Sequence, residues 1–213
     1  MTTVSAEGGD ARRSVDEVPG SADAVQAGAS ASVGGVGAAR FGAGRSAAVV
    51  VVSTPTARGL EDDRSGPRLV EWLRACGYEC PSPRYAEDGG PVGDVLRELL
   101  GGGADSDGDA QRAPRVVVTT GGTGLNLADL TPQVTEALLD RQTPGIMHAL
   151  WTAGLQSTPT AVMSQGVAGV AGTAFVVNLP GSTGGVRDGI AVLTPLLPHI
   201  QAQLEDCGEP PAL

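Results

Sequence analysis

Residues 115–124 read RVVVTTGGTG, and this stretch decides the fold that the sequence predicts. Its β-branched apolar run is typical of a strand buried on both faces, the kind of strand that parallel sheets contain. The run passes without interruption into a turn that is mostly glycine. A buried strand followed directly by such a turn is typical of the edge at which α/β sheets bind ligands.

Other strands are predicted on either side of this stretch. Residues 47–53 (AAVVVVS) predict a second strand buried on both faces. Residues 174–179 (AFVVNL) predict a third, which leads into another glycine-rich turn at 180–185 (PGSTGG). We also expect a short strand within residues 78–86, where two prolines interrupt it, and one at residues 160–164.

Segments with helical spacing of apolar residues separate these strands. We expect helices at residues 65–76, 91–100, 131–139 and 144–150, and one from the 180–185 turn to about residue 204. Thr131 is expected to be an N-cap, with Pro132 in the first turn. Because strands and helices alternate, the sequence predicts a three-layer α/β/α domain with a mostly parallel sheet.

Composition divides the chain into three parts. Residues 1–45 are rich in Gly, Ala and Ser, and they hold too little apolar surface to offset the backbone entropy lost on folding. We therefore expect residues 1–45 to be a disordered tail, residues 46–206 to form the α/β domain, and residues 207–213 to be a short flexible C-terminus. The tail has five acids and four Arg, so 19 acids and ten Arg fall in the rest of the chain.

The charge pattern excludes several kinds of function. The net charge is -10, every basic residue is Arg, and there is no basic run, which argues against a nucleic-acid surface or a polybasic membrane anchor. The absence of Lys excludes a P-loop lysine or a Schiff-base lysine. No long apolar stretch predicts a membrane-spanning helix, and no secretion signal is evident, so we expect a cytoplasmic protein without a membrane partner.

The two glycine-rich turns follow strands whose carboxyl ends should meet at one edge of the sheet. Glycine lets backbone N–H groups converge on an anion, and the second turn also begins a helix, whose N-terminus carries partial positive charge. An acidic chain without Lys could bind a phosphate in this way. The alternative for either turn taken alone is an ordinary tight connection between a strand and a helix.

Two acids are expected beside these turns. Asp129 closely follows Gly124, and Asp88 lies in a turn at the end of the short strand predicted within 78–86. Each alone could be a helix cap or a solvated turn residue. Together on one cleft edge they would suit Mg²⁺, which takes oxygen ligands from one or two carboxylates and from substrate phosphates.

Several ordered segments resemble the signature of molybdopterin adenylyltransferases, the MogA/MoaB-type proteins of molybdenum cofactor biosynthesis. The resemblance covers roughly residues 47–204. The segments that carry it are 63–67 (DRSGP), 119–124 (TTGGTG), 129–132 (DLTP), 140–141 (DR), 144–145 (PG), 158–161 (TPTA), Ser164, 166–169 (GVAG) and 178–182 (NLPGS).

The resemblance implies a homotrimer with a molybdopterin-binding type of α/β fold. It implies that Mg-ATP adenylylates molybdopterin, that pyrophosphate leaves, and that the product passes to a partner protein that inserts molybdenum. Asp129 and Asp88 match the family's two functional acids, and we assign them to catalysis and Mg²⁺ binding. The residues that would bind substrate or nucleotide are Thr120, Gly121, Gly122, Thr123, Gly124, Ser164, Asn178, Pro180, Gly181 and Ser182.

Two departures from the family pattern leave an alternative open. Thr54 stands where the family usually has Asp, and Gln165 stands where it usually has Arg. Gln cannot supply the fixed charge or the paired donors that Arg offers to phosphate. A non-catalytic molybdopterin-binding or scaffold member of the family is therefore the second hypothesis. An unrelated phosphate-binding protein on a doubly wound sheet is the third.

The remaining chemically distinctive residues predict less. Cys76 and Cys80 have no nearby His, and Gly77 is expected to break the helix between them, so we expect free thiols. His148 and His199 each lie in a helical pattern and are expected to be surface or core residues. Trp72 is expected in the core, and Trp151 is a candidate for a subunit interface.

Overall fold

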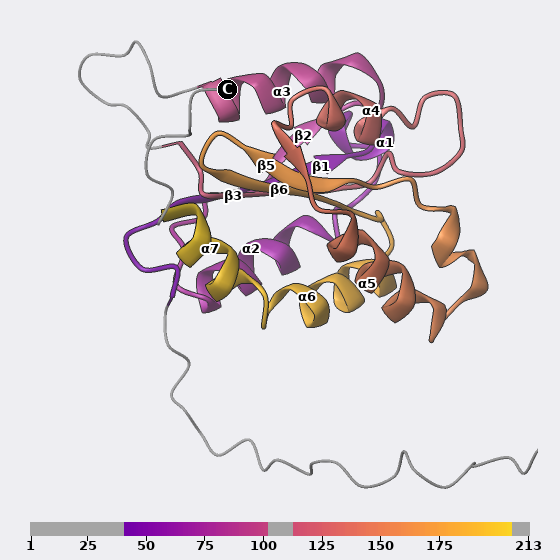
Figure 1. Ribbon diagram of the computed structural model, residues 1–213. Coiled ribbons are helices and arrows are strands. Elements are labelled where there is room, and N and C mark those ends of the chain that lie inside the picture. Colours follow the sequence, from indigo (N-terminus) through magenta and orange to yellow (C-terminus); the bar gives the residue numbers. More distant parts are fainter. Residues whose placement is uncertain (1–40, 102–112, 206–213) are drawn as a thin grey trace, which may run out of the picture. The chain divides into compact units, whose positions relative to one another are not determined.

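The computed structural model describes residues 41–101 and 113–205 (Figure 1). The predicted tail up to residue 40, most of the loop around residues 101–114 and the predicted C-terminal segment lie outside the described residues. The strands are β1 (Ala47–Val52), β2 (Arg84–Ala86), β3 (Val116–Thr120), β4 (Arg141–Gln142), β5 (Ala168–Ala171) and β6 (Ala174–Leu179). The helices are α1 (Thr54–Ala57), α2 (Gly66–Ala75), α3 (Gly90–Gly101), α4 (Thr131–Glu136), α5 (Pro144–Leu155), α6 (Thr183–Leu193) and α7 (Leu197–Glu205), with a 3-10 helix η1 (Pro159–Met163).

The strands form one mixed sheet in the order β2-β1-β3-β6-β5-β4. The pairs β1 with β2, β1 with β3, and β3 with β6 are parallel, whereas β5 is antiparallel to β6 and β4 to β5. Thr120 is paired with Leu179, so the turns after β3 and β6 leave the sheet at the same edge. The predicted α/β fold with a mostly parallel core is confirmed.

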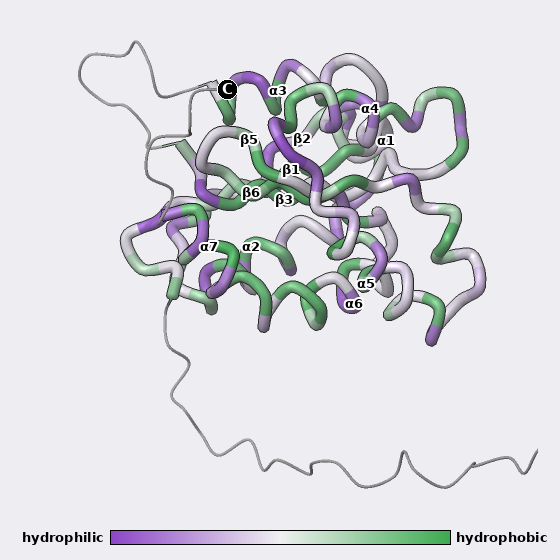
Figure 2. The backbone as a smooth tube through the Cα atoms, in the orientation of Figure 1, coloured by the Kyte–Doolittle hydropathy of each residue, from purple (hydrophilic) through white to green (hydrophobic). Residues whose placement is uncertain are grey.

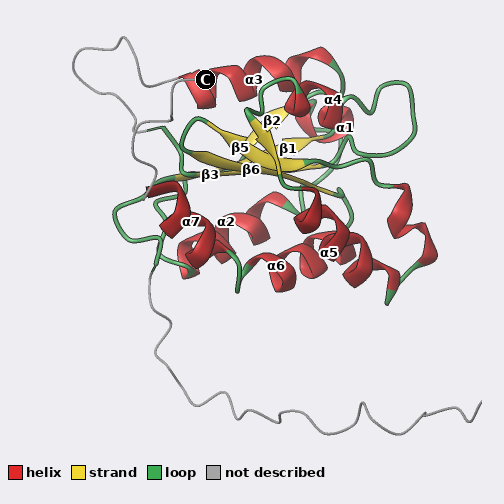
Figure 3. Ribbon diagram, in the orientation of Figure 1, coloured by secondary structure: helices red, strands yellow, loops and turns green. Residues whose placement is uncertain are grey.

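Helices cover both faces of the sheet, which gives three layers (Figures 1 and 3). Helices α3 and α4 pack on one face, and α2, α5, α6 and α7 pack on the other. Each strand of the central three is buried along its whole length because alternate residues enter different cores. Val49, Val118 and Val177 enter the larger core, while Val50, Val117 and Val176 enter the smaller one. Figure 2 shows hydrophobic residues concentrated along β3 and β6.

Three predicted elements were wrong. Residues 160–164 are not a strand: residues 159–163 form the helical turn η1, because Pro159 begins it and the Thr158 hydroxyl accepts a hydrogen bond from the Thr160 N–H. The single helix predicted up to residue 204 is two helices, α6 and α7. Thr131 is not the N-cap of α4, since Leu130 occupies that position and Thr131 is already helical.

The predicted tail extends too far by a few residues. Phe41 packs against the larger core and meets the Tyr78 ring edge-on, with 5.9 Å between the ring centroids. The Gly42 N–H donates to the carbonyl of Cys76, and the Arg45 guanidinium pairs with the carboxylate of Glu205. Residues 41–45 therefore belong to the folded domain.

The structure tests the predictions for Cys, Trp and His. Cys76 and Cys80 are free and buried, and burial raises the pKa of the Cys80 thiol to about 11. Trp72 is in the core, as expected, and its indole N–H donates to the Thr194 hydroxyl at 2.9 Å. His148 and His199 are both exposed.

Candidate functional site

The two glycine-rich turns lie against each other at the carboxyl ends of β3 and β6. The Gly121 N–H donates to the carbonyl of Leu179 at 3.1 Å, and the Thr120 hydroxyl donates to the carbonyl of Pro180 at 2.9 Å. A Cβ added to Gly181 would lie 3.3 Å from the Cα of Gly121. The backbones therefore lie in direct contact, and a side chain at Gly181 would crowd Gly121.

Glycine is required at two positions of the first turn. Gly121 and Gly122 have φ angles of 101° and 62°, which side chains other than glycine rarely tolerate. A Cβ on Gly121 would clash with the carbonyl oxygen of Val52 at the end of β1. The turn is thus held between β1 and β6, where it forms the floor of the site.

Asp88 lies beside this turn, and Thr54 holds it. The Asp88 Oδ2 accepts hydrogen bonds from the Thr54 N–H at 2.9 Å and from the Thr54 hydroxyl at 2.8 Å. The same hydroxyl accepts from the Asp88 N–H at 3.1 Å. The other oxygen, Oδ1, lies 3.3 Å from the point that a Cβ on Gly122 would occupy. Thr54 therefore fixes one carboxylate oxygen and leaves the other facing the turn.

Thr131 adds a second side-chain oxygen near Gly122. Thr131 is fully buried, and its Oγ1 has no hydrogen-bond partner among the described residues. The space that a Cβ on Gly122 would need is occupied by this hydroxyl and approached by Asp88 Oδ1. Because Gly122 has no side chain, the Thr131 hydroxyl and Asp88 Oδ1 can both lie close to its backbone.

Asp129 lies at the other end of the same turn. Its Oδ2 accepts from the Asn126 N–H at 3.0 Å and lies 2.7 Å from the point that a Cβ on Gly124 would occupy. The structure therefore brings both predicted acids to the turn, Asp88 at Gly122 and Asp129 at Gly124. Within residues 41–101 and 113–205, no group of three or more His, Cys, Asp or Glu side chains could hold a metal ion.

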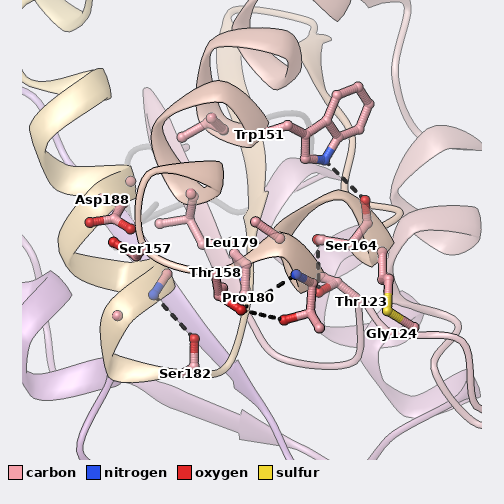
Figure 4. Close-up of a pocket in the computed structure, with 18 of the residues that line it drawn as sticks. Thr123, Gly124, Trp151, Ser157, Thr158, Ser164, Leu179, Pro180, Ser182 and Asp188 are labelled. Atoms are coloured by element: carbon pink, nitrogen blue, oxygen red, sulfur yellow. Dashed lines mark hydrogen bonds between the residues drawn. The ribbon is translucent and has the colours of Figure 1, made fainter.

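An apolar cavity of about 340 Å³ opens on one side of these turns, between α5, η1 and α6 (Figure 4). Met147, Leu150, Trp151 and Leu179 contribute much of its apolar lining. The indole N–H of Trp151 donates to the carbonyl of Ser164 at 3.0 Å, which holds the ring in place. Most of the exposed lining surface is apolar, so the cavity suits the apolar or aromatic part of a ligand.

A second, polar cavity of about 500 Å³ lies on the other side of Gly181. Strand β2 lies on one side of β1, and the next strand in sequence, β3, lies on the other side. The cavity is at this change of direction. Such switch points are where open α/β sheets bind ligands. Its polar lining includes Ser53, Thr56, Glu61, Asp62, Asp63, Arg64, Ser65, Thr120 and Thr183.

The segment before α2 closes this polar cavity. Asp63 Oδ1 accepts from the N–H groups of Ser65 and Gly66, both at 2.9 Å. Asp63 therefore caps N–H groups at the start of α2 that have no partner within the helix. The Ser65 hydroxyl is then free to donate to the carbonyl of Gly181 at 2.9 Å. The segment that begins α2 is therefore tied directly to the second glycine-rich turn.

Two ionisable side chains in this region, Glu87 and Tyr85, have shifted pKa values. Hydrogen bonding to Arg58 lowers the pKa of Glu87, the neighbour of Asp88, below its ordinary value. On the facing side, burial and the nearby carboxylate of Asp63 raise the pKa of the Tyr85 hydroxyl. The Tyr85 hydroxyl donates to Asp63 Oδ2 at 3.2 Å.

Two of the predicted binding residues, Ser182 and Ser164, make side-chain hydrogen bonds within the protein. Ser182 is the N-cap of α6, and its Oγ accepts from the Gly185 N–H at 3.1 Å. The Ser164 hydroxyl donates to the Thr123 hydroxyl at 3.2 Å. Both residues line the apolar cavity, so these contacts orient hydroxyl groups at its wall.

Asn178 supports the site from within the smaller core. Its Nδ2 donates to the hydroxyls of Thr119 and Thr135 at 2.9 and 3.0 Å, and its Oδ1 accepts from the Val167 N–H at 3.0 Å. Strand alternation puts this side chain on the α3 and α4 face of the sheet, and the residue also contributes to the lining of the apolar cavity. The amide therefore ties β3, α4 and the segment before β5 together beneath the turns.

Gln165 is hydrogen-bonded to the last two residues of the first glycine-rich turn, Thr123 and Gly124. Its N–H donates to the carbonyl of Thr123 at 2.9 Å, and its amide nitrogen donates to the carbonyl of Gly124. Thr54 and Gln165, the two departures from the family pattern, are therefore both bonded to the site, one at Asp88 and one at the turn beside Asp129.

Sequence reasoning missed one candidate residue in the apolar cavity. Asp188 lies on α6, one helical turn beyond Gly184, and lines the cavity opposite the end of α5. The spacing from the 180–185 turn could have found it, because residues four apart share a helix face. Trp151, which we considered for a subunit interface, also lines this cavity.

The comparisons with known proteins agree with this geometry. Residues 48–199 match a family described as a probable molybdopterin binding domain. A solved structure of MogA is 42% identical with a TM-score of 0.68, covering 75% of this chain and 99% of that one. The Mog protein of Mycobacterium ulcerans is 41% identical with a TM-score of 0.67, over the same shares of each chain.

The curated relatives give the same result. A molybdopterin adenylyltransferase of Helicobacter pylori (strain ATCC 700392 / 26695) is 36% identical over 151 residues, which are 71% of this chain and 82% of the relative. The chain spans only part of the first curated relatives that it matches, between 12% and 49% of their length.

The chain belongs to the molybdopterin-binding domain family, as its sequence motifs predicted. Family membership rules out the third hypothesis, an unrelated phosphate-binding protein. No helix within the described ranges is long and apolar enough to cross a membrane.

Proposed function

We propose that this protein takes part in molybdenum cofactor biosynthesis by adenylylating molybdopterin with Mg-ATP, with release of pyrophosphate. The observation that carries the proposal is the pair of touching glycine-rich turns with Asp88 and Asp129 beside the first of them. The relative in Helicobacter pylori that is named molybdopterin adenylyltransferase supports the reaction.

The residues present suit a reaction that needs positioning and charge neutralisation more than a protein nucleophile. In the proposed reaction an oxygen of the pterin's terminal phosphate attacks the α-phosphorus of ATP, a new P–O–P bond forms, and the bond to pyrophosphate breaks. At the start of α6 the Gly185 N–H already donates to the Ser182 hydroxyl. The N–H groups that can hold a phosphate are therefore those of Thr183 and Gly184, which have no partner within the helix.

The side-chain oxygens beside the first glycine-rich turn, at residues 121–124, fit Mg²⁺ as ligands. They belong to the two carboxylates of Asp88 and Asp129 and the unpartnered hydroxyl of Thr131. Mg²⁺ keeps several waters and needs only one or two protein carboxylates together with substrate phosphates. When bound, the ion would offset the negative charge that the phosphates and these acids bring together.

The test is incubation of the protein with molybdopterin, ATP and Mg²⁺, followed by mass spectrometry of the pterin. We expect adenylylated pterin from the wild type, and loss of turnover with retained pterin binding in Asp129→Asn. Asp94→Asn, at an exposed acid of α3, is the matched control and should keep full turnover. Undiminished turnover in Asp129→Asn would remove this acid from the catalytic machinery.

A second candidate function is non-catalytic molybdopterin binding. It is favoured by Thr54 and Gln165, because both neutral side chains are already engaged in holding the site rather than offering charge to a substrate. Calorimetry with molybdopterin and with ATP separately distinguishes the two functions. A carrier would bind the pterin and show no Mg²⁺-dependent binding of ATP.

We also propose that the protein is a homotrimer that passes its product to a molybdenum-inserting partner protein. Large apolar side chains are exposed beside the site, and Leu127 is 98% exposed. The others in this region are Leu125, Leu130, Leu155, Val162 and Met163. Light scattering coupled to size exclusion measures the mass, and a monomer at micromolar concentration would refute the trimer.

A further inference from the structure

Asp188 carries the only charge on the wall of the apolar cavity, among the described residues that line it. Its side chain is 16% exposed. A carboxylate in apolar surroundings is costly unless it is paired, so its presence there needs a physical explanation.

Arg187 pairs with one oxygen of this carboxylate. Its Nε donates to Asp188 Oδ1 at 2.9 Å, and its Nη2 lies 2.8 Å from the same oxygen. The Nη2 also donates to the Ser157 hydroxyl at 3.1 Å, which ties α6 to the end of α5. Within the described residues, no group donates to Asp188 Oδ2. The pairing lowers the cost of burial and leaves the carboxylate able to accept further hydrogen bonds.

An ionised carboxylate only accepts hydrogen bonds, and it matches a ligand edge that offers two parallel donors. The 2-amino-4-oxopyrimidine edge of a pterin has such a pair, the ring N3–H and the 2-amino group. Guanine carries the same edge. Adenine presents a donor next to an acceptor, and the acceptor would face a carboxylate oxygen unfavourably.

The dimensions of the cavity agree with a pterin that carries a phosphate. Ser182 caps α6, and Asp188 lies six residues further on, which is about 9 Å along the helix axis at 1.5 Å per residue. This length is comparable with that of three fused six-membered rings. With its 2-amino edge at Asp188, the pterin would lie against Trp151 and Leu179, and its phosphate would reach the first turn of α6.

We propose that Asp188 is the specificity-determining residue of the apolar cavity and binds the 2-amino-4-oxopyrimidine edge of the pterin. The inference rests on the proposed function for the identity of the ligand. It assigns the pterin to the apolar cavity, and it makes adenine a poor ligand there.

The test compares three ligands by fluorescence-monitored or calorimetric titration: pterin, lumazine and guanosine. Lumazine has an oxygen in place of the 2-amino group and is otherwise the same ring system. We expect the wild type to bind pterin at least tenfold more tightly than lumazine. Guanosine, which carries the same edge as pterin, should also bind more tightly than lumazine. Asp188→Asn should lose at least tenfold in pterin affinity and bind lumazine more tightly than the wild type does, because a carboxamide offers one acceptor and one donor.

The gain of lumazine binding separates recognition from a structural role, since a misfolded variant would lose all ligands. Asp94→Asn is again the matched control and should bind all three ligands as the wild type does. Equal pterin affinity in wild type and Asp188→Asn, no pterin binding by the wild type, or tighter binding of lumazine than of guanosine would each overturn the inference. A wild type that shows the expected pterin selectivity but forms no adenylylated product would refute the proposed reaction and leave the role of Asp188 intact.

Discussion

Replacement of Thr54 by Val removes a hydroxyl that holds a proposed catalytic acid while keeping the shape of the side chain. In the native protein this hydroxyl donates to Asp88 Oδ2 at 2.8 Å and accepts from the Asp88 N–H at 3.1 Å. Val retains only the backbone N–H donor, which lies 2.9 Å from the same carboxylate oxygen. The variant therefore frees Asp88 to rotate without deleting it.

The size of the effect follows from the bonds that are lost. A hydrogen bond to a charged group contributes about 1.5–3 kcal/mol. Because Asp88 is half-buried and keeps one donor, we expect the lower end, about 1.5 kcal/mol, which corresponds to roughly a tenfold loss in kcat/KM. The loss should fall on kcat, since the apolar cavity assigned to the pterin is unchanged, and KM for the pterin should stay within about twofold.

The assay is the initial rate of adenylylated pterin formation over a range of Mg²⁺ concentrations. Thr54→Ser retains the hydroxyl and should keep activity within about threefold of the wild type, whereas Thr54→Val should not. Wild-type kcat in Thr54→Val, or equal losses in both variants, would refute the idea that this hydroxyl positions Asp88.

Three further predictions concern stability and reactivity. Asn178→Ala should destabilise the domain by about 3 kcal/mol in urea unfolding, because it removes two buried hydrogen bonds and one partly buried one and leaves their partners unsatisfied; a change under about 1 kcal/mol would contradict this. Cys80 should resist iodoacetamide at pH 8 in the native protein and react once it is unfolded, because burial raises its pKa to about 11; mass mapping of alkylated peptides checks this. Hydrogen bonding to Arg45 lowers the pKa of Glu205, so this pair stabilises the fold above the ordinary Glu pKa, and the stabilisation is lost as the pH falls through the lowered value. Arg45→Ala should therefore lower thermal stability more at pH 7 than at pH 3, where only its hydrogen bonds to the carbonyls of Phe41 and Ala43 are lost, and an equal effect at both pH values would exclude the linkage.

The buried strands could be predicted because their sequences leave few alternatives. Residues 47–52 and 116–118 are runs of β-branched and small apolar residues, too short for a buried helix and flanked by polar turns. By contrast, β5 (AGVA) contains alanine and glycine, which carry little strand signal. Gly169 is needed there because a Cβ would clash with the carbonyl of Arg141 on the adjacent β4. That requirement is visible only once the two strands are paired.

The site was predictable to the extent that its residues are close in sequence. The first turn and Asp129 lie within a few residues of each other, so their proximity followed from spacing alone. Asp88 was predicted from its position after a short strand, but its contact with Thr54 depends on the pairing of β1 with β2. Helical spacing from the 180–185 turn could have pointed to Asp188. The roles of Thr54 and Gln165 were not predictable, because each depends on elements that meet only in the folded domain.

The central claim is that the carboxyl edge of this sheet transfers an adenylyl group to molybdopterin. The most direct measurement is a parallel count of adenylylated pterin and released pyrophosphate when the wild type is supplied with molybdopterin, ATP and Mg²⁺. We predict that both products form together in a one-to-one ratio, and only when Mg²⁺ is present. If the protein binds molybdopterin but forms neither product, while an active adenylyltransferase does so on the same substrate, the claim is wrong.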